Sequence, residues 1–416
     1  METLLEQGGG RKKPKNGAAA PAGYVEVEVT SNDDLLREIL VRLPDTASLA
    51  RAALACKRWR RVASDPSLRR FHSLHAPPPL LAFIMSEAPP RVYYDCEGPN
   101  RLVLRIPSSN PHLAAADFRL KDFTSKNPRS GSVIDEWLLR GYDGGLLLLS
   151  YGLIQHEELT VYDPIARTAD FLRRPDFGSI GVHYALVADD GVAFRVFAAQ
   201  FFDGRVMGAV FDSRTGEWAA LPTLGAPYPW YMRGGMRAGR FAYWQSNTNL
   251  RAGNSNEAEH TLVFDTIAMV WTLIQVPFPT KESYCVADIA EHGGLCLVAS
   301  KEQTLQLWVR ENNRWAIKKE VLLLKEFELL KKLRHDERMK RVRILAVRDG
   351  YIYMEFWSTR KPNSYLLVLN WETMELSVYA NRTTGKYRGP AFPFLMTWAP
   401  PLLSPAKVHA LDLQGV

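Results

Sequence analysis

The sequence predicts an α+β protein with more than one domain, in which a three-helix module precedes an all-β propeller of about six four-stranded blades. Three observations support this prediction. Apolar residues recur at helical spacing within residues 31–75, short strands separated by turns begin near residue 76, and turn glycines recur at the period of a propeller blade. The predicted divisions are a disordered tail (1–30), the helical module (31–75), the propeller (76–400) and a C-terminal tail (401–416).

The composition is that of a chain that can bury more than one core, since 46% of its 416 residues are hydrophobic and 23% are charged. No apolar run approaches the roughly 20 residues of a membrane-spanning helix, and the first thirty residues lack the apolar stretch of a signal peptide. The four cysteines form no CxxC pair, which predicts neither a disulfide framework nor a zinc site. We therefore expect a protein of the cytoplasm or nucleus that has no membrane contact.

The N-terminal tail is rich in Gly, Ala, Pro and Lys, a composition that favours disorder. Its cluster Lys12-Lys13-Pro14-Lys15 has the form of a nuclear localisation signal, although a merely solvated tail is the stronger interpretation.

Three helices are predicted between residues 31 and 66. The first begins at the capping-box sequence Ser31-Asn32-Asp33-Asp34 and ends before Pro44. The second begins at Asp45 or Thr46, and the third carries Trp59 and ends before Asp65-Pro66. Of the 31 residues from 33 to 63, 17 are apolar, which is too many for so small a bundle to cover alone. A partner or the rest of the chain must cover part of this surface.

The segment after residue 76 repeats one pattern. Residues 183–222 and 284–321 each read as four strands joined by short turns, and a further unit is predicted around residues 80–106. Turn glycines precede strongly apolar strands at Gly145, Gly191, Gly239, Gly294 and Gly350. A tryptophan follows the third turn of three units, at Trp218, Trp271 and Trp315, and we expect each to pack between neighbouring blades.

One segment departs from this repeat. Residues 318–343 contain ten basic and five acidic residues around scattered leucines. This pattern predicts an amphipathic helix inserted between two units, which packs its apolar face on the domain.

No catalytic, cofactor-binding or metal-binding residue is predicted. The nine histidines form no HExxH pattern, and the sequence contains no phosphate-binding glycine loop and no GxSxG nucleophile motif. Basic residues cluster at Lys57, Arg58, Arg60 and Arg61, where they suit either a DNA groove or an acidic protein partner. The lack of interleaved aromatic residues favours the protein partner over nucleic acid.

The run from Asp33 to Pro44, with the later sequences Cys56-Lys57-Arg58-Trp59-Arg60 and Ser64-Asp65-Pro66, resembles the F-box of plant F-box proteins. The repeats behind it are similar to kelch-like or F-box-associated propellers. The resemblance implies that the helical module binds the Skp-type adaptor of a cullin-RING ubiquitin ligase. The residues that match the motif, and that we expect to bind the adaptor, are Leu35, Leu36, Ile39, Leu43, Pro44 and Trp59. A core role is the competing interpretation, and it is strongest for Ile39 and Trp59.

The resemblance thus predicts a non-enzymatic subunit in which the propeller binds an unidentified target protein for ubiquitination. The long connections 247–259 and 358–364 are the predicted target-binding loops. The family usually has Leu-Pro before its acidic pair, whereas this chain has Ser31-Asn32, and a scaffold protein that no longer binds the adaptor is therefore one alternative. A sugar-binding propeller, a propeller enzyme and a DNA-binding protein are the others.

Overall fold

The computed structural model describes residues 32–43, 46–63, 80–87, 100–105, 137–151, 158–164, 167–177, 181–189, 193–226, 235–245, 259–278, 282–301, 304–323, 340–348, 350–358, 363–384 and 391–395. The chain divides into two compact units, one of residues 1–76 with 401–416 and one of residues 77–400. No helix in the ranges just given is long and apolar enough to cross a membrane.

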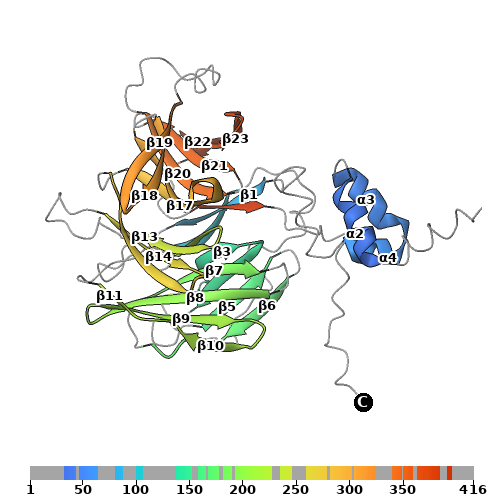
Figure 1. Cartoon of the computed structure of the whole chain (residues 1–416), viewed down its shortest axis with the longest axis horizontal. Coiled ribbons are helices and arrows are strands. Elements are labelled where there is room, and N and C mark those ends of the chain that lie inside the picture. The colour runs from blue at the N-terminus through green and yellow to red at the C-terminus, as the bar shows by residue number, and fades with distance from the viewer. Residues whose placement is uncertain are drawn as a thin grey trace, which may run out of the picture. The chain divides into compact units, whose positions relative to one another are not determined.

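The first unit contains the three predicted helices, α2 (Asp33–Val41), α3 (Thr46–Ala55) and α4 (Lys57–Ala63) (Figure 1). Asn32 caps α2, because its side-chain Oδ1 accepts hydrogen bonds from the backbone N–H groups of Asp34 (2.8 Å) and Leu35 (3.4 Å). The Sγ atom of Cys56 takes the same role at α4, where it lies 3.5 Å from the backbone nitrogen of Trp59. The starts of α2 and α4 are therefore fixed by local hydrogen bonds.

The core of this bundle draws on all three helices. Six of the side chains that the structure describes are buried: Leu36, Leu40, Leu49, Ala53, Val62 and Ala63. Each of these side chains is removed from water, and their burial holds the three helices together.

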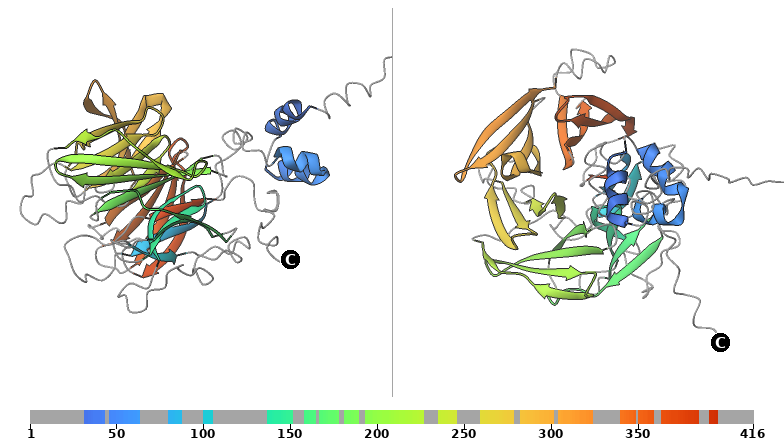
Figure 2. Two further views of the ribbon diagram at one scale, coloured as in Figure 1. Left: turned by 90° about the horizontal axis from the view of Figure 1, so that it is seen from below. Right: turned by 45° about the vertical axis from the view of Figure 1, so that its right-hand side comes forward.

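The second unit consists of antiparallel strands in five sheets that surround a common axis (Figure 2). The first sheet has seven strands in the order β24-β1-β2-β3-β4-β5-β6. Their bounds are β1 Leu80–Glu87, β2 Asn100–Arg105, β3 Leu138–Asp143, β4 Leu146–Tyr151, β5 Glu158–Asp163, β6 Thr168–Leu172 and β24 Ala391–Leu395.

The other four sheets are meanders of consecutive strands. The second contains β7 Val182–Asp189, β8 Ala193–Phe202, β9 Arg205–Asp212, β10 Glu217–Ala220 and the short β11 Leu224–Gly225. The third contains β12 Met236–Ala238, β13 Phe241–Gln245, β14 His260–Asp265 and β15 Val270–Gln275. The fourth contains β16 Ser283–Ile289, β17 Gly294–Lys301, β18 Thr304–Glu311 and β19 Arg314–Leu322, with a 3-10 turn, η4, at Ala290–His292. The fifth contains β20 Lys340–Arg348, β21 Tyr351–Ser358, β22 Asn363–Asn370 and β23 Leu376–Thr384. These sheets confirm the predicted propeller.

Of the sixth predicted unit, around residues 80–106, the structure describes two strands. Its strands β1 and β2 pair with each other and, through β1, with the C-terminal strand β24, whereas β2 meets β3 only at Asn100 and Arg101. The two faces of β1 contact different sheets: Phe83 packs on the fifth, and Ile84 packs on the first. Strands β24, β1 and β2 therefore fill the space between the fifth meander and β3, and the two ends of the propeller segment close the ring together.

The predicted tryptophan positions are confirmed. The indole Nε1 of Trp218 donates to the carbonyl of Arg173 (2.6 Å), and that of Trp315 donates to the carbonyl of Gln275 (3.0 Å), so each ties its blade to the preceding one. Trp271 is buried between the second and third sheets, in contact with Leu221. Trp271 is therefore a core residue, whereas Trp218 and Trp315 are partly buried and pack against the edge of the core.

The prediction of a helix over residues 318–343 is wrong at both ends. Residues 314–322 form β19 and residues 340–348 form β20, while residues 324–339 lie outside the described part. The charged residues gave this segment the pattern of an exposed helix. In the structure they are exposed for another reason, because β19 is the outermost strand of its sheet and carries lysine and glutamate on its solvent face.

The sheets are tied together near the axis by one buried carboxylate, that of Asp143 at the end of β3. Its Oδ2 accepts hydrogen bonds from Arg237 Nη1 of β12 (2.5 Å) and from the backbone N–H of Ala188 in β7 (2.7 Å). Its Oδ1 lies 2.7 Å from Arg348 Nη2 of β20. The side chain of Asp143 is fully buried, whereas the two arginines are about one quarter exposed. We call this set the Asp143 hub, and it links four of the five sheets.

A neighbouring contact extends the connection to the fourth sheet, since the carboxylate of Asp288 in β16 accepts from the backbone N–H of Arg240 (2.9 Å). Burial acts to raise the pKa of Asp143, but the charges of Arg348 and Arg237 and the hydrogen bonds of the hub outweigh it and hold the pKa below its ordinary value of 3.8. The carboxylate therefore stays charged in the folded protein.

Replacing Asp143 by Asn will lower the free energy of unfolding by about 3 to 5 kcal/mol, because it leaves two partly buried arginines without their counter-ion. Urea denaturation followed by far-ultraviolet circular dichroism measures this loss. The control is Asp189→Asn, which breaks a pair with Arg195 inside one sheet (2.6 Å). An equal loss in both variants would contradict the role of the hub.

The difference in stability between the wild type and Asp143→Asn will depend on pH. A carboxylate with a depressed pKa contributes stability that is present above its ordinary value and is lost as the pH falls through the folded value. The difference in unfolding free energy between the wild type and Asp143→Asn will therefore be constant near neutral pH and will shrink below pH 3.8. A difference that grew on acidification would contradict the depressed pKa.

Gly208→Ala will destabilise the contact between the second and third sheets. A Cβ atom at Gly208 would lie 2.5 Å from Cζ2 of Trp271, so we expect a loss of about 1 to 3 kcal/mol from overpacking. Combining it with Trp271→Phe will give a smaller loss than the sum of the two single changes, as measured by urea denaturation. Gly216→Ala is the control, since it meets open space and carries only the cost of its positive φ.

Candidate functional site

One side of α2 presents apolar side chains to solvent. Leu35 is 44% exposed and Ile39 is 41% exposed, and their spacing of four residues places them on the same flank of the helix. Leu43, which follows the helix, is partly exposed. We call these three residues the α2 stripe. Leu36 and Leu40, in contrast, face the core with at most 1% of their surface exposed.

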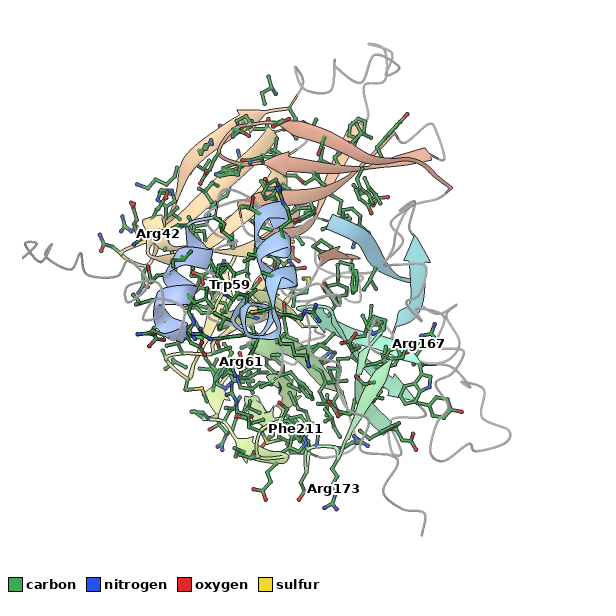
Figure 3. The ribbon with its side chains drawn as sticks, turned by 90° about the vertical axis from the view of Figure 1, so that its right-hand side faces the viewer. Arg42, Trp59, Arg61, Arg167, Arg173 and Phe211 are labelled. Carbon is green, nitrogen blue, oxygen red and sulfur yellow. The ribbon has the colours of Figure 1, made fainter. Side chains whose placement is uncertain are left out.

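The structure thus separates the six residues predicted to bind the adaptor. Leu35, Ile39 and Leu43 lie together on the stripe, so the core interpretation of Ile39 is wrong. Leu36 is buried inside the bundle, and Trp59 on α4 is partly buried (Figure 3). Pro44 lies outside the described residues.

The charged residues beside the stripe belong to α2 and its C-terminal cap. Glu38 and Arg42 are one helical turn apart, and their side chains form a loose ion pair of 3.7 Å between Oε2 and Nη2. Both are largely exposed. The apolar surface is therefore bordered by one acidic and one basic group.

The basic residues of α4 face another flank of α2. Asp33 accepts hydrogen bonds from Arg58 Nε (2.8 Å) and Arg61 Nη2 (2.7 Å), and these contacts join α4 to the first turn of α2. The hydrogen bond from Arg58, with the charges of both arginines, holds the pKa of Asp33 below its ordinary value of 3.8 against the opposing effect of burial. Arg58 and Arg61 therefore share Asp33 as an intramolecular partner.

The propeller exposes a second apolar feature that the sequence analysis missed. In the turn between β14 and β15, Ile267 is 73% exposed, Met269 is 38% exposed and Val270 is 54% exposed. The corresponding turns of the second and fourth sheets carry Arg214 and Thr215, and Asn312 and Asn313. Aligning the units on the residue six positions before each tryptophan would have revealed this difference.

The backbone of that turn follows the repeat even though its side chains do not. Met269 has a φ of 57°, in the left-handed region that Gly216 (74°) and Asn313 (64°) occupy in the corresponding turns. Asp265 stabilises the turn by accepting hydrogen bonds from the backbone N–H groups of Ile267 and Ala268, both at 3.0 Å. The apolar side chains are therefore held on an ordered turn.

Most of each predicted target-binding loop lies outside the described residues, which leave out 246–258 and 359–362. Within the described ranges no group of three or more His, Cys, Asp or Glu side chains is placed to hold a metal ion. Burial raises the pKa of Cys285 to about 12 and that of Cys296 to about 11, so both thiols are protonated at neutral pH.

Comparison with known proteins agrees with this division of the chain. A family model described as F-box-like matches residues 33–75, which include α2, α3 and α4. A second, described as F-box protein AT5G49610-like, beta-propeller, matches residues 255–402, which include β14 to β24. No curated protein matches the sequence.

Among solved structures, the crystal structure of TolB from Acinetobacter baumannii is similar at 10% sequence identity, with a TM-score of 0.35. The match covers 68% of this chain and 62% of the TolB chain. The family matches agree with the structure: the three-helix bundle is similar to the F-box-like family, and the second half of the ring of sheets is similar to the F-box protein AT5G49610-like β-propeller family.

Proposed function

We propose that this chain is the target-recognition subunit of a Skp–cullin–F-box ubiquitin ligase. The F-box-like domain binds a Skp-type adaptor through the α2 stripe, and the propeller binds the protein to be ubiquitinated. The observation that carries the proposal is the exposure of Leu35 and Ile39 on the domain that matches the F-box-like family. Such a subunit acts in the cytoplasm or nucleus.

The energetics of the helical bundle support a partner on this flank. Burying a leucine or isoleucine side chain contributes about 1.5 to 3 kcal/mol relative to leaving it in water. The α2 stripe leaves this contribution unused in the isolated chain. A partner surface that covers the stripe gains that free energy and stabilises the bundle at the same time.

The proposed role needs no catalytic side chain in this chain. A ligase subunit that holds a target near a ubiquitin-charged carrier makes the transfer effectively intramolecular, and the rate gain comes from proximity. The architecture of an F-box-like domain and a propeller is typical of such non-catalytic subunits. The chemistry belongs to other subunits of the assembly.

The substitution of Ser31-Asn32 for the usual Leu-Pro has a local explanation. Asn32 caps α2 through its side chain, a contribution to helix stability that proline, with no side-chain acceptor, cannot make. This residue therefore helps to hold the first turn from which the α2 stripe projects. The same change motivates the rival proposal of a scaffold that does not bind the adaptor. The two proposals differ in one measurable property, the affinity of the chain for the adaptor.

Leu35→Asp and Ile39→Asp will each raise the dissociation constant for a purified Skp-type adaptor by about tenfold or more, because a carboxylate in an apolar contact costs at least about 1.4 kcal/mol. The double variant will show no binding at micromolar concentrations. Isothermal titration calorimetry with the full-length chain measures these constants.

The matched control is Ile317→Asp on β19, since Ile317 is 43% exposed and belongs to the propeller. It will bind the adaptor as the wild type does. Absence of adaptor binding by the wild-type chain at micromolar concentrations would favour the scaffold, and equal binding by the stripe variants would show that the adaptor uses another surface.

A further inference from the structure

We propose that Asp33, Arg58 and Arg61 form an ion-pair clamp that sets the orientation of α2 on α4 and thereby positions the α2 stripe for the adaptor. Asp33 is then a positioning residue, which acts on the partner without touching it. This inference rests on the proposed adaptor binding and adds to it a residue whose charge controls the affinity.

The geometry of the clamp engages both oxygens of one carboxylate. Oδ1 of Asp33 accepts a hydrogen bond from Arg58 Nε (2.8 Å) and lies 2.7 Å from Arg58 Nη2, and Oδ2 accepts a hydrogen bond from Arg61 Nη2 (2.7 Å). Arg58 and Arg61 are three residues apart on α4, so they project from the same side of that helix. Asp33 is the first residue of α2, where the helix dipole also favours a negative charge.

Chain connectivity alone does not fix how α2 lies on α4. Only Cys56 separates α3 from α4, but α3 stands between α2 and α4 in the sequence. Of the residues of α4, Val62 and Ala63 are buried and Trp59 is partly buried, and such apolar contacts are not directional. Contacts between the side chains of α2 and α4 must therefore set their relative orientation, and the clamp supplies directional ones.

The clamp and the stripe lie on different sides of α2. At 100° per residue, Leu35 and Ile39 are turned away from Asp33 by roughly 160° and 120° around the helix axis. The core residues Leu36 and Leu40 lie between these two flanks. A flat partner surface that covers the stripe does not reach Asp33, and any effect of this residue on affinity must pass through the position of the helix.

Salt affects the ion pairs of the clamp and the apolar contact of the α2 stripe differently. The clamp side chains are partly exposed, with Arg58 28%, Asp33 38% and Arg61 71% accessible, so dissolved ions screen the pairs. Burial of the apolar stripe, in contrast, is not weakened by sodium chloride. If the clamp positions the stripe, adaptor affinity will fall as salt rises although the contact itself is apolar.

Direct contact of the arginines with an acidic adaptor surface is the competing explanation, and Asp33→Asn separates the two. This change frees both arginines while leaving their charge in place. If they bound the partner directly, the affinity would stay the same or rise; if they act through the clamp, it will fall.

The experiment measures the dissociation constant of the full-length chain for a purified Skp-type adaptor. In about 0.1 M NaCl, where the Debye length is about 10 Å, we expect Asp33→Asn to raise the constant about threefold to tenfold. Arg58→Gln will have a similar effect, and the double variant will be no weaker than the worse of the two single variants. In about 1 M NaCl, where the Debye length is about 3 Å, the wild type will bind as weakly as Asp33→Asn.

The control is Asp34→Asn, which removes the same charge from the same helical turn but breaks only a pair with Arg37 within α2 (2.6 Å). It will leave the affinity within about twofold of wild type. Asp33→Glu, which keeps a carboxylate, will restore most of the affinity. The wild-type salt series needs no variant, and an affinity that does not change with salt would overturn the clamp even where Asp33→Asn fails to fold.

The outcomes separate this inference from the proposed function. If the wild-type chain binds no adaptor, the proposed function fails and the clamp fails with it. If the wild type binds but Asp33→Asn binds equally well, and salt has no effect, only the clamp is overturned. If Asp33→Asn binds more tightly, the arginines contact the adaptor directly.

Discussion

The propeller depends on a single carboxylate placed where its sheets converge. A ring of sheets needs no continuous hydrogen-bonded ladder between blades, so its closure rests on side-chain packing around the outside and on polar contacts near the axis. Asp143 supplies the polar contacts, because its two oxygens receive groups from β7, β12 and β20 while the side chain itself is fully buried. These partners together offset the cost of burying this charge. We therefore expect the positions of β3, β7, β12 and β20 to depend on one another. The apolar contacts farther out, such as that of Trp271, then pack against blades whose positions are already fixed.

The local features of the fold could be predicted from the sequence, whereas its long-range contacts could not. Turn glycines and the repeated tryptophans predicted the meanders, because strand and turn chemistry acts over a few residues. Asp143 and Arg237 are 94 residues apart, and nothing in the pattern around either one indicates the other. The pairing of β1 with β24 escaped prediction for the same reason, and the predicted unit at residues 80–106 is consequently completed from the other end of the chain. The mistaken helix at residues 318–343 shows a different limit, since an outermost strand tolerates the same charged residues as an exposed helix.

At the candidate site, the motif correctly marked α2 but not the direction of each side chain. Leu35 and Leu36 are adjacent in the motif, yet one is 44% exposed and the other 1%. Helical geometry accounts for the difference, since neighbouring residues point about 100° apart and only one can face the core. The ion pairs of Asp33 with Arg58 and Arg61 had no sequence signal beyond their charges, because they join residues 25 and 28 positions apart. The motif therefore did not predict how one helix packs on another.

The pairing of β1 with β24 bears on how the protein is made. Among the described strands, β1 leaves the ribosome first and β24 last, so Ile84 must wait for almost the entire propeller segment to be synthesised before its neighbours Phe392 and Phe394 emerge. Until then the nascent chain carries an open-ended stack of sheets in which β1 pairs with β2 but has one free edge, and such an edge is suited to chaperones and prone to aggregation. A stop codon just before residue 391 would leave β1 to β23 in the chain, but β1 would lack its partner β24, and we expect protein quality control to degrade the product.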